Sequence, residues 1–176
     1  MRRTLNILGV FIFSLFLLSC EKDEDKIDYT AVGQMAGQWY VQLLDDKGSD
    51  ALGKYVELVT SNTGTNSADS LIVSDLGNIA SHGFNVKTKV SLGNKSFSID
   101  KGQNYSYYKP NSKEEVYANY DIKISITNGK ISTASKKLPS GTMSDEISFN
   151  IEFSDEPGVI YTIKGFRVSG FIEDKP

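Results

Sequence analysis

The chain has 176 residues, of which 19 are Lys or Arg and 22 are Asp or Glu, so its net charge is −3 at neutral pH. This length suits one domain with a sizeable core. The acidic balance argues against a nucleic-acid partner, because neutralising phosphates requires clustered Lys and Arg. The single cysteine excludes a disulfide framework. Because the sequence has only one cysteine and one histidine, it offers too few ligands for a zinc site.

The first 19 residues have the pattern of a lipoprotein signal peptide. Arg2 and Arg3 form the charged start, and residues 5–18 form an apolar run shorter than the ~20 residues that span a bilayer. The motif Leu17-Leu18-Ser19-Cys20 has the form of a lipobox, at which a bacterial lipoprotein is lipidated on cysteine and cleaved just before it. We therefore expect a mature chain that begins at Cys20 and hangs from a membrane by a lipid. The alternative is an ordinary secretory peptide with a chance cysteine.

Residues 20–32 are expected to form the lipidated cysteine and a flexible tether. Residues 21–28 are polar and mostly acidic, with too little apolar surface to fold alone. An acidic run directly after the lipidated cysteine resembles the surface-export signal of Bacteroidetes lipoproteins. That resemblance implies the outer face of the outer membrane, with the periplasmic face as the second choice. A merely solvated linker would predict anchoring equally well and would not distinguish the two faces.

The remaining chain, residues 33–176, is expected to be one all-β domain. Removing residues 1–19 takes away Arg2 and Arg3 and leaves 17 basic against 22 acidic residues, a net charge of −5 on 157 residues. Apolar and polar residues alternate with period two in several stretches, each typical of a strand with one buried face. The predicted strands are 38–44, 52–60, 70–74, 84–90, 96–100, 121–127, 130–134, 147–153 and 159–171.

Turn chemistry separates these strands. Asn128-Gly129 supplies the positive φ angles of a two-residue hairpin loop, and Asp155-Glu156-Pro157-Gly158 fits a type I or II turn. Residues 45–50, 62–66 and 92–94 are further polar breaks that contain glycine or asparagine. Short strands joined by tight turns predict an antiparallel up-and-down, lipocalin-like barrel of about eight or nine strands, with a two-sheet sandwich as the runner-up.

Two residues far apart in the sequence are similar to a lipocalin signature. Gly37-Gln38-Trp39 opens the first predicted strand, and Arg167 lies in the last one. The resemblance implies that Trp39 plugs one end of the barrel beneath Arg167, and stacking of a guanidinium on an indole is favourable by roughly 0.5–2 kcal/mol. The alternative is a core tryptophan and a solvated arginine that do not meet.

The chain from about residue 33 to residue 171 also resembles a more specific family, the Bacteroidetes lipoproteins called lipid-binding putative hydrolases. The resemblance implies a lipocalin-like barrel and an apolar ligand, and it brings no established catalytic residue. The similar pieces are residues 37–41, 75–78, 84–87, 120–124, 144–145, 153–158, 161–163, 165–167 and 169–171.

Catalytic constellations are sparse. A serine-hydrolase triad would have to use His82, with Asp75 or Asp121 and one of the serines, although the nucleophile-elbow pattern is absent. A lone loop histidine is more often structural. Glu146 and Glu152 are a candidate carboxylate pair for glycoside hydrolysis, with plain solvent exposure as the alternative.

Two loops complete the candidate sites. The acidic residues of 45–50 could hold a hard cation but lack the spacing of an EF-hand, and we expect no metal and no cofactor. Tyr105, Tyr107 and Tyr108 belong to a tyrosine-rich connection that also holds Tyr117 and Tyr120. These tyrosines could line the barrel mouth and bind a sugar ring or an acyl chain, or simply cover the rim.

The leading hypothesis is a membrane-anchored, lipocalin-like module that binds a lipid or other apolar small molecule. The alternatives are a weak hydrolase that uses His82 and a surface lipoprotein that binds glycan or neighbouring envelope proteins. Whether an eight-stranded barrel is filled by its own side chains or holds a small ligand cannot be read from the inward residues alone.

Overall fold

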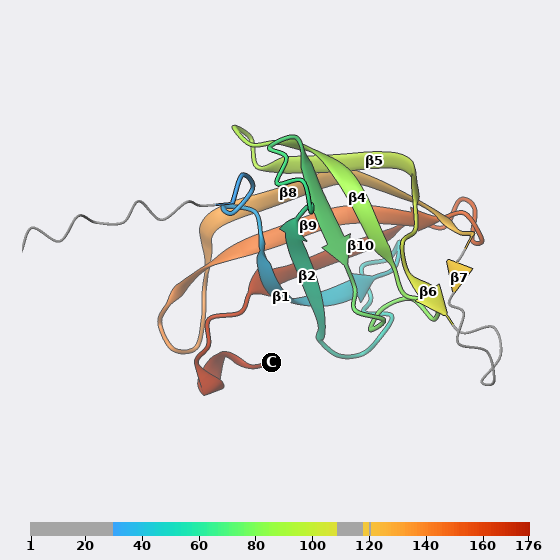
Figure 1. Ribbon diagram of the computed structural model, residues 1–176. Coiled ribbons are helices and arrows are strands. Elements are labelled where there is room, and N and C mark those ends of the chain that lie inside the picture. The colour runs from blue at the N-terminus through green and yellow to red at the C-terminus, as the bar shows by residue number, and fades with distance from the viewer. Residues whose placement is uncertain (1–29, 109–117, 120) are drawn as a thin grey trace, which may run out of the picture.

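Eight antiparallel strands close into a barrel in the computed structural model, which describes residues 30–108, 118–119 and 121–176 (Figure 1). This confirms the predicted all-β, up-and-down architecture. The barrel strands are β1 (Gly37–Leu44), β2 (Val56–Asn62), β3 (Ser70–Ser74), β4 (Asn85–Ser91), β5 (Ser96–Gln103), β8 (Lys123–Lys137), β9 (Met143–Phe153) and β10 (Tyr161–Arg167). A separate two-stranded sheet pairs β6 (Tyr107–Tyr108) with β7 (Ala118–Asn119).

Each barrel strand pairs with its neighbours in the chain, and the excursion between β5 and β8 does not change the order. The barrel closes where β1 pairs with β10, so that Trp39 lies opposite Arg167 on one side and Leu58 of β2 on the other. Full closure leaves no edge strand in the barrel for pairing with another chain.

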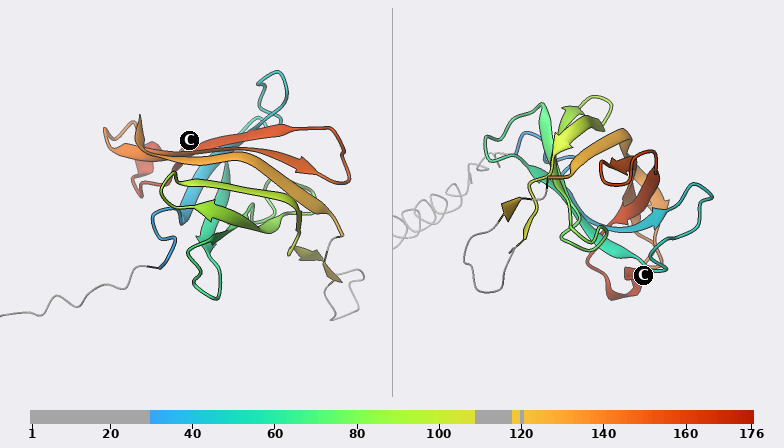
Figure 2. Two further views of the ribbon diagram at one scale, coloured as in Figure 1. Left: turned by 90° about the horizontal axis from the view of Figure 1, so that it is seen from above. Right: turned by 90° about the vertical axis from the view of Figure 1, so that its right-hand side faces the viewer.

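The barrel has two ends, which we call the base and the mouth. The base is formed by residues 30–36, 63–69, 92–95, 138–142 and 168–176. The mouth is formed by residues 45–55, 75–84, 104–106 and 154–160. In Figure 1 the base lies at the left, on the side of residues 30–36, and the mouth lies at the right beside β6 and β7. The right-hand view of Figure 2 looks toward the mouth.

The barrel interior is filled by its own side chains. A side chain that bordered an internal void large enough for water would keep some accessible surface, and the central inward residues keep none. The inward residues with 0% exposure are Trp39, Val41, Leu58, Leu71, Val73, Val86, Ile124, Ile126, Ile147 and Ile163. This question was open at the level of sequence, and the structure decides it in favour of a packed core.

Asn128-Gly129 is not the hairpin turn that its sequence predicts. Strand β8 runs through it without interruption, with Thr127 opposite Asn150 and Lys130 opposite Ser148, so one extra residue forms a β-bulge. Asn128 has the positive φ of 54° that a turn would also require. A Cβ on Gly129 would lie 2.3 Å from the carbonyl oxygen of Phe97 on β5, so the neighbouring strand needs glycine there. Two predicted strands therefore merge into one of 15 residues.

The other connections follow their turn residues more closely. Gly158 has a φ of 84°, and the Val159 amide donates to the Glu156 oxygen at 3.1 Å, which makes residues 156–159 a type II turn around Pro157. The C-terminus ends in a 3₁₀ turn, η2 (Ile172–Asp174). Across the ranges described here, no helix has the length and apolar character that crossing a bilayer would demand.

Candidate functional site

The base is closed by Trp39 and Arg167, which the structure brings together. The guanidinium carbon of Arg167 lies 4.4 Å from the centre of the fully buried Trp39 ring. The indole Nε1 donates to the Thr60 hydroxyl at 2.9 Å, and that hydroxyl donates to the Met35 carbonyl at 2.6 Å. The polar atom of the largest core side chain is therefore satisfied by a residue that ties the N-terminal segment to β2.

The position of the Arg167 guanidinium also explains why residue 37, two residues before Trp39, is a glycine. A Cβ on Gly37 would lie 2.0 Å from Nη1 of Arg167, so any side chain there would displace the guanidinium. Arg167 donates to the Ala36 carbonyl at 2.5 Å and to Asp145 Oδ2 at 3.2 Å. Val32, which is completely buried, covers the same end from the N-terminal segment. These contacts make the base a fixed closure.

At the mouth, Asp75 organises the loop between β3 and β4. Its buried carboxylate accepts four backbone N–H groups, from Phe84 at 2.7 Å, Gly77 at 2.9 Å, Ala80 at 3.0 Å and Ile79 at 3.1 Å. The sequence signal for this role is Asp-x-Gly, because an aspartate at the start of a turn accepts the amide two residues on. Asp75 is thus fully used in holding the loop.

Asn104 completes this polar support from the end of β5. Its buried side chain accepts the Asn85 amide at 3.0 Å and the Ser106 amide at 2.9 Å, and it donates to the Gly83 carbonyl at 3.1 Å. The loop after β3, the start of β4 and the segment after β5 are therefore joined through one amide group. No pattern in the sequence marks Asn104 for this role.

His82 lies in the same loop, between a backbone carbonyl and a carboxylate. Its Nδ1 is 2.7 Å from the Gly83 carbonyl oxygen, so this nitrogen carries the proton and donates. Its Nε2 is 3.7 Å from Asp155 Oδ2 in the turn between β9 and β10, and its ring packs edge-on against Phe153 at 5.2 Å between centres. The side chain is 9% exposed.

This geometry corrects the carboxylates expected beside His82. Asp75 is occupied by backbone amides, and Asp121 is 95% exposed at 3.4 Å from the Lys123 ammonium. The carboxylate that faces the imidazole is Asp155, which the sequence reasoning missed because the pairing joins two loops 73 residues apart. A triad needs Nε2 to face a serine hydroxyl while a carboxylate orients Nδ1. Here the carboxylate is on the Nε2 side.

Two cavities flank His82 at the mouth. The larger, of about 550 Å³, is lined by Ser74, Asp75, Leu76, Gly77, Ser81, His82, Gly83, Asn85, Tyr105 and Ser106. The smaller, of about 160 Å³, is lined by Leu43, Ile79, Ala80, Ser81, His82, Phe153, Asp155, Glu156 and Tyr161. Ser81 and His82 border both cavities, so the loop that Asp75 holds is the wall between them.

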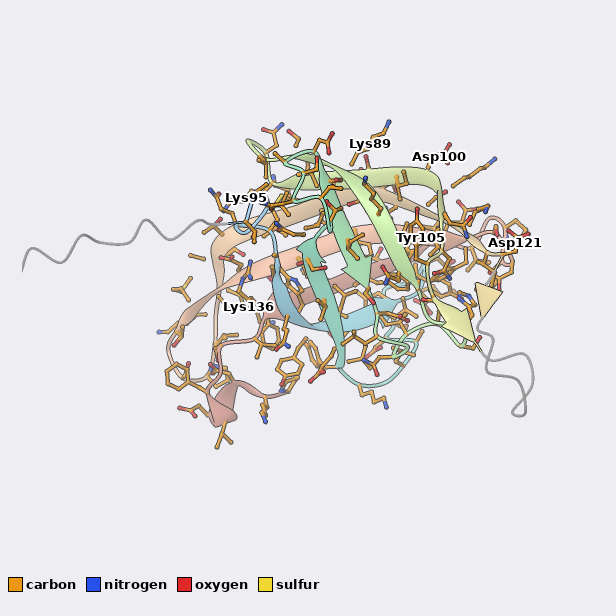
Figure 3. The ribbon with its side chains drawn as sticks, in the orientation of Figure 1. Lys89, Lys95, Asp100, Tyr105, Asp121 and Lys136 are labelled. Atoms are coloured by element: carbon orange, nitrogen blue, oxygen red, sulfur yellow. The ribbon has the colours of Figure 1, made fainter. Side chains whose placement is uncertain are left out.

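Tyrosines contribute to both cavities. Tyr105 is 46% exposed on the wall of the larger one, at the mouth end of the barrel (Figure 3). Tyr161 borders the smaller cavity, and its hydroxyl donates to the Glu156 carboxylate at 3.2 Å. Burial is the main cause that raises the pKa of this phenol, and the negative charge of Glu156 raises it further. Tyr161 therefore stays a donor at neutral pH. The side chains of Tyr107 and Tyr108 lie outside the described residues.

The other acidic candidates do not assemble into sites. Glu146 and Glu152 are six residues apart on β9, which separates their backbones by about 20 Å, beyond the ~9.5 Å limit for a glycosidase pair. Asp45 accepts the amides of Lys47 and Ser49 within its own loop. Among the described residues, no group of three or more His, Cys, Asp or Glu side chains could hold a metal ion.

Cys20 and the tether up to residue 29 lie outside the described residues, so the anchor remains a prediction from sequence. No curated protein matches this chain. The model of one protein family, described as lipid-binding putative hydrolase, matches residues 24–172, which include the whole barrel and the start of the C-terminal turn. The chain therefore belongs to the family of lipid-binding putative hydrolases.

Proposed function

We propose that this protein is a lipid-anchored envelope lipoprotein that binds a lipid or other apolar small molecule at the mouth of its barrel. The main observation behind the proposal is the cavity of about 550 Å³ at the mouth, which is larger than the cavity of about 360 Å³ beside the β4–β5 hairpin and Gly129. At the base, Trp39 and Arg167 close the barrel itself. Ligand sites commonly have volumes of ~300–1,000 Å³, and this cavity lies in that range although its lining is mostly polar. Family membership supports a lipid as the ligand.

Both parts of an amphiphilic ligand have a counterpart at the mouth. Hydroxyls of Ser74, Ser81, Ser106 and Tyr105 border the larger cavity and suit an uncharged polar head group. Leu43, Ile79 and Phe153 border the smaller cavity, and Ile79 and Ala80 pack against the core. Because the interior is filled, an acyl chain longer than the smaller cavity would enter by displacing Ile79 and Ala80 with the loop that carries them.

The anchor part of the proposal is supported by the lipobox at Cys20 and by the acidic run that follows it. A lipid on Cys20 would hold the protein at the outer membrane. The acidic run favours the cell surface, in the manner of Bacteroidetes lipoproteins. With a mature net charge of −5, attachment through the lipid is more favourable than bulk attraction to anionic head groups.

Native mass spectrometry of the full protein, followed by organic extraction, tests ligand binding. A fatty acid or lipid that co-purifies at fixed stoichiometry, or saturable uptake of a fluorescent fatty acid, is the expected result. Ser81→Trp should reduce that uptake at least about tenfold, because Ser81 borders both cavities and an indole at this position would occupy part of their volume.

Ser49→Trp is the matched control, because Ser49 is exposed at the same end of the barrel and borders neither cavity. Equal uptake by the two variants would contradict binding at the mouth. A protein that carries no lipid and takes up no fatty acid would contradict the lipid-binding proposal as a whole.

A further inference from the structure

The C-terminal segment presents two large apolar side chains to solvent at the base. Ile172 is 82% exposed and Phe171 is 51% exposed, which makes Ile172 the most exposed large hydrophobic residue among those described. Met143, at the first position of β9 at the same end, is 51% exposed. Single exposed apolar residues are common on protein surfaces. Whether Phe171 and Ile172 have a function therefore depends on where they lie and on how rigidly the turn holds them.

The segment is fixed to the barrel and is not a frayed end. Asp174, only 4% exposed, accepts the Ser140 amide at 2.8 Å, the Ser140 hydroxyl at 2.7 Å and the Ser169 hydroxyl at 2.5 Å. The amide of Val168 donates to the Gln38 carbonyl at 2.9 Å, which extends the pairing with β1 beyond the end of β10. A buried carboxylate thus ties the last turn to the β8–β9 hairpin.

This arrangement directs Phe171 and Ile172 outward. The Asp174 amide donates to the Phe171 carbonyl at 3.3 Å and the Lys175 amide donates to the Ile172 carbonyl at 3.2 Å, which closes the 3₁₀ turn. Within this turn the side chain of Asp174 points into the protein while that of Ile172 points away from it. Hydrogen bonds hold the turn, while Ile172 is left almost fully exposed and Phe171 is half exposed.

The tether arrives at this same end of the barrel. Residues 30–36 precede β1 at the base, and residues 168–176 follow β10 there, because β1 and β10 are antiparallel neighbours. The Ala31 amide donates to Asn66 at 2.8 Å, which fixes the point where the chain departs. The ten residue-to-residue steps from Cys20 to Thr30 reach at most about 35 Å when fully extended. A lipid on Cys20 would therefore keep the base near the bilayer.

We propose that Phe171 and Ile172 form a second membrane contact, which inserts into the interface of the bilayer that carries the lipid on Cys20. The inference rests on the proposed anchoring. Aromatic and aliphatic side chains held on a fixed turn suit the boundary between head groups and acyl chains. The lipid supplies attachment, and the turn sets orientation, with the base toward the bilayer and the mouth away from it.

The test uses the acylated full-length protein in vesicles of phosphatidylethanolamine and phosphatidylglycerol. Lipidation consumes Cys20, the only cysteine, so Ile172→Cys supplies a single free thiol for an environment-sensitive fluorophore. Ile160→Cys is the matched control, because Ile160 is 53% exposed at the mouth. With nitroxide-labelled head groups, the label at position 172 should be quenched about threefold more than the label at position 160, since interfacial side chains sit ~5–10 Å into that boundary.

The outcomes separate the inference from the anchor on which it depends. Protein that floats with the vesicles and shows equal quenching at both positions would overturn the second contact and leave the anchor standing. Weak quenching at position 172 in floated protein would likewise count against a membrane contact and favour a partner protein on this surface. Protein that fails to float would overturn the anchor and the inference together.

Discussion

The base and the mouth close the same barrel by different physical means. At the base, Trp39, Met35 and Val32 are completely buried, and Arg167 stacks on the indole. At the mouth, the carboxylate of Asp75 and the amide of Asn104 hold a loop by its backbone. Apolar burial is lost in full when a segment opens, whereas a hydrogen bond exchanged for water costs ~1 kcal/mol net, or ~1.5–3 kcal/mol where the acceptor is a carboxylate such as that of Asp75.

This difference indicates which end can open. Local opening is favoured where few apolar contacts are broken and where backbone groups can be rehydrated. Residues 76–82, none of which is fully buried, meet that description better than the base does, whereas Phe84 at the end of the loop belongs to the core. Ser81 and His82 in this stretch separate the two cavities. The proposed ligand access at the mouth agrees with this difference, because the base stays closed when the mouth loop opens.

The largest expected effect is at the base. Trp39→Ala should lower the free energy of unfolding by about 3–5 kcal/mol, because it removes the largest fully buried side chain and leaves Arg167 without its stacking partner. Urea denaturation followed by circular dichroism measures the change. Tyr105→Ala, which truncates a half-exposed aromatic at the mouth, should cost less than about 1 kcal/mol in the same assay. Similar costs at the two positions would remove the distinction between the ends.

The mouth loop should respond locally. Asp75→Asn preserves the shape of the side chain but replaces one of two acceptor oxygens by a donor that faces backbone amides. We expect a loss of about 2 kcal/mol in the free energy of unfolding and faster amide hydrogen exchange in residues 77–84. Exchange of Trp39, Val41 and their neighbours in β1 should remain slow. If amide exchange became faster only at the base, the mouth would not be the end of the barrel that opens more easily.

The C-terminal turn should loosen in acid. Burial alone would raise the pKa of Asp174, but the hydrogen bonds from Ser169 and Ser140 outweigh it and hold the pKa below its usual range. A lowered folded-state pKa means that the stabilisation is present above the unfolded pKa and is lost as pH falls through the folded value. The protection of the residue 171–175 amides, measured against their intrinsic exchange rates at the same pH, should therefore fall below about pH 4. Asp174→Asn should show the loosened state at neutral pH, with no further acid step.

The smallest effect is expected at the pair formed by His82 and Asp155. Asp155 is 44% exposed and 3.7 Å from the imidazole, so Asp155→Asn should change the free energy of unfolding by less than about 1 kcal/mol. The hydrolase alternative is tested at the same place with a nitrophenyl ester. If the protein hydrolyses the ester and His82→Ala keeps the full rate, this histidine does not catalyse the reaction.

The sequence predicted the fold well where side-chain alternation decides it. Strand β3 was predicted with its observed bounds, and Ile147, Phe149, Ile151 and Phe153 all point inward on β9 as their alternation requires. Alternation works because one face of each strand must be buried, so the pattern is a local consequence of the global core. The association of Trp39 with Arg167 came from resemblance, and the structure adds the reason for Gly37, whose missing Cβ leaves room for the guanidinium.

Where a local sequence motif is compatible with two structures, contacts between distant segments select one of them. The positive φ at Asn128 suits a turn or a bulge, and the backbone of Phe97 beside Gly129 selects the bulge. Asp75 could orient an imidazole or hold a loop, and four amides brought to it by folding select the loop. The partner of His82 and the filled interior likewise depend on contacts between distant segments. Composition and spacing fixed which side chains face inward, and only packing determined how much room they leave.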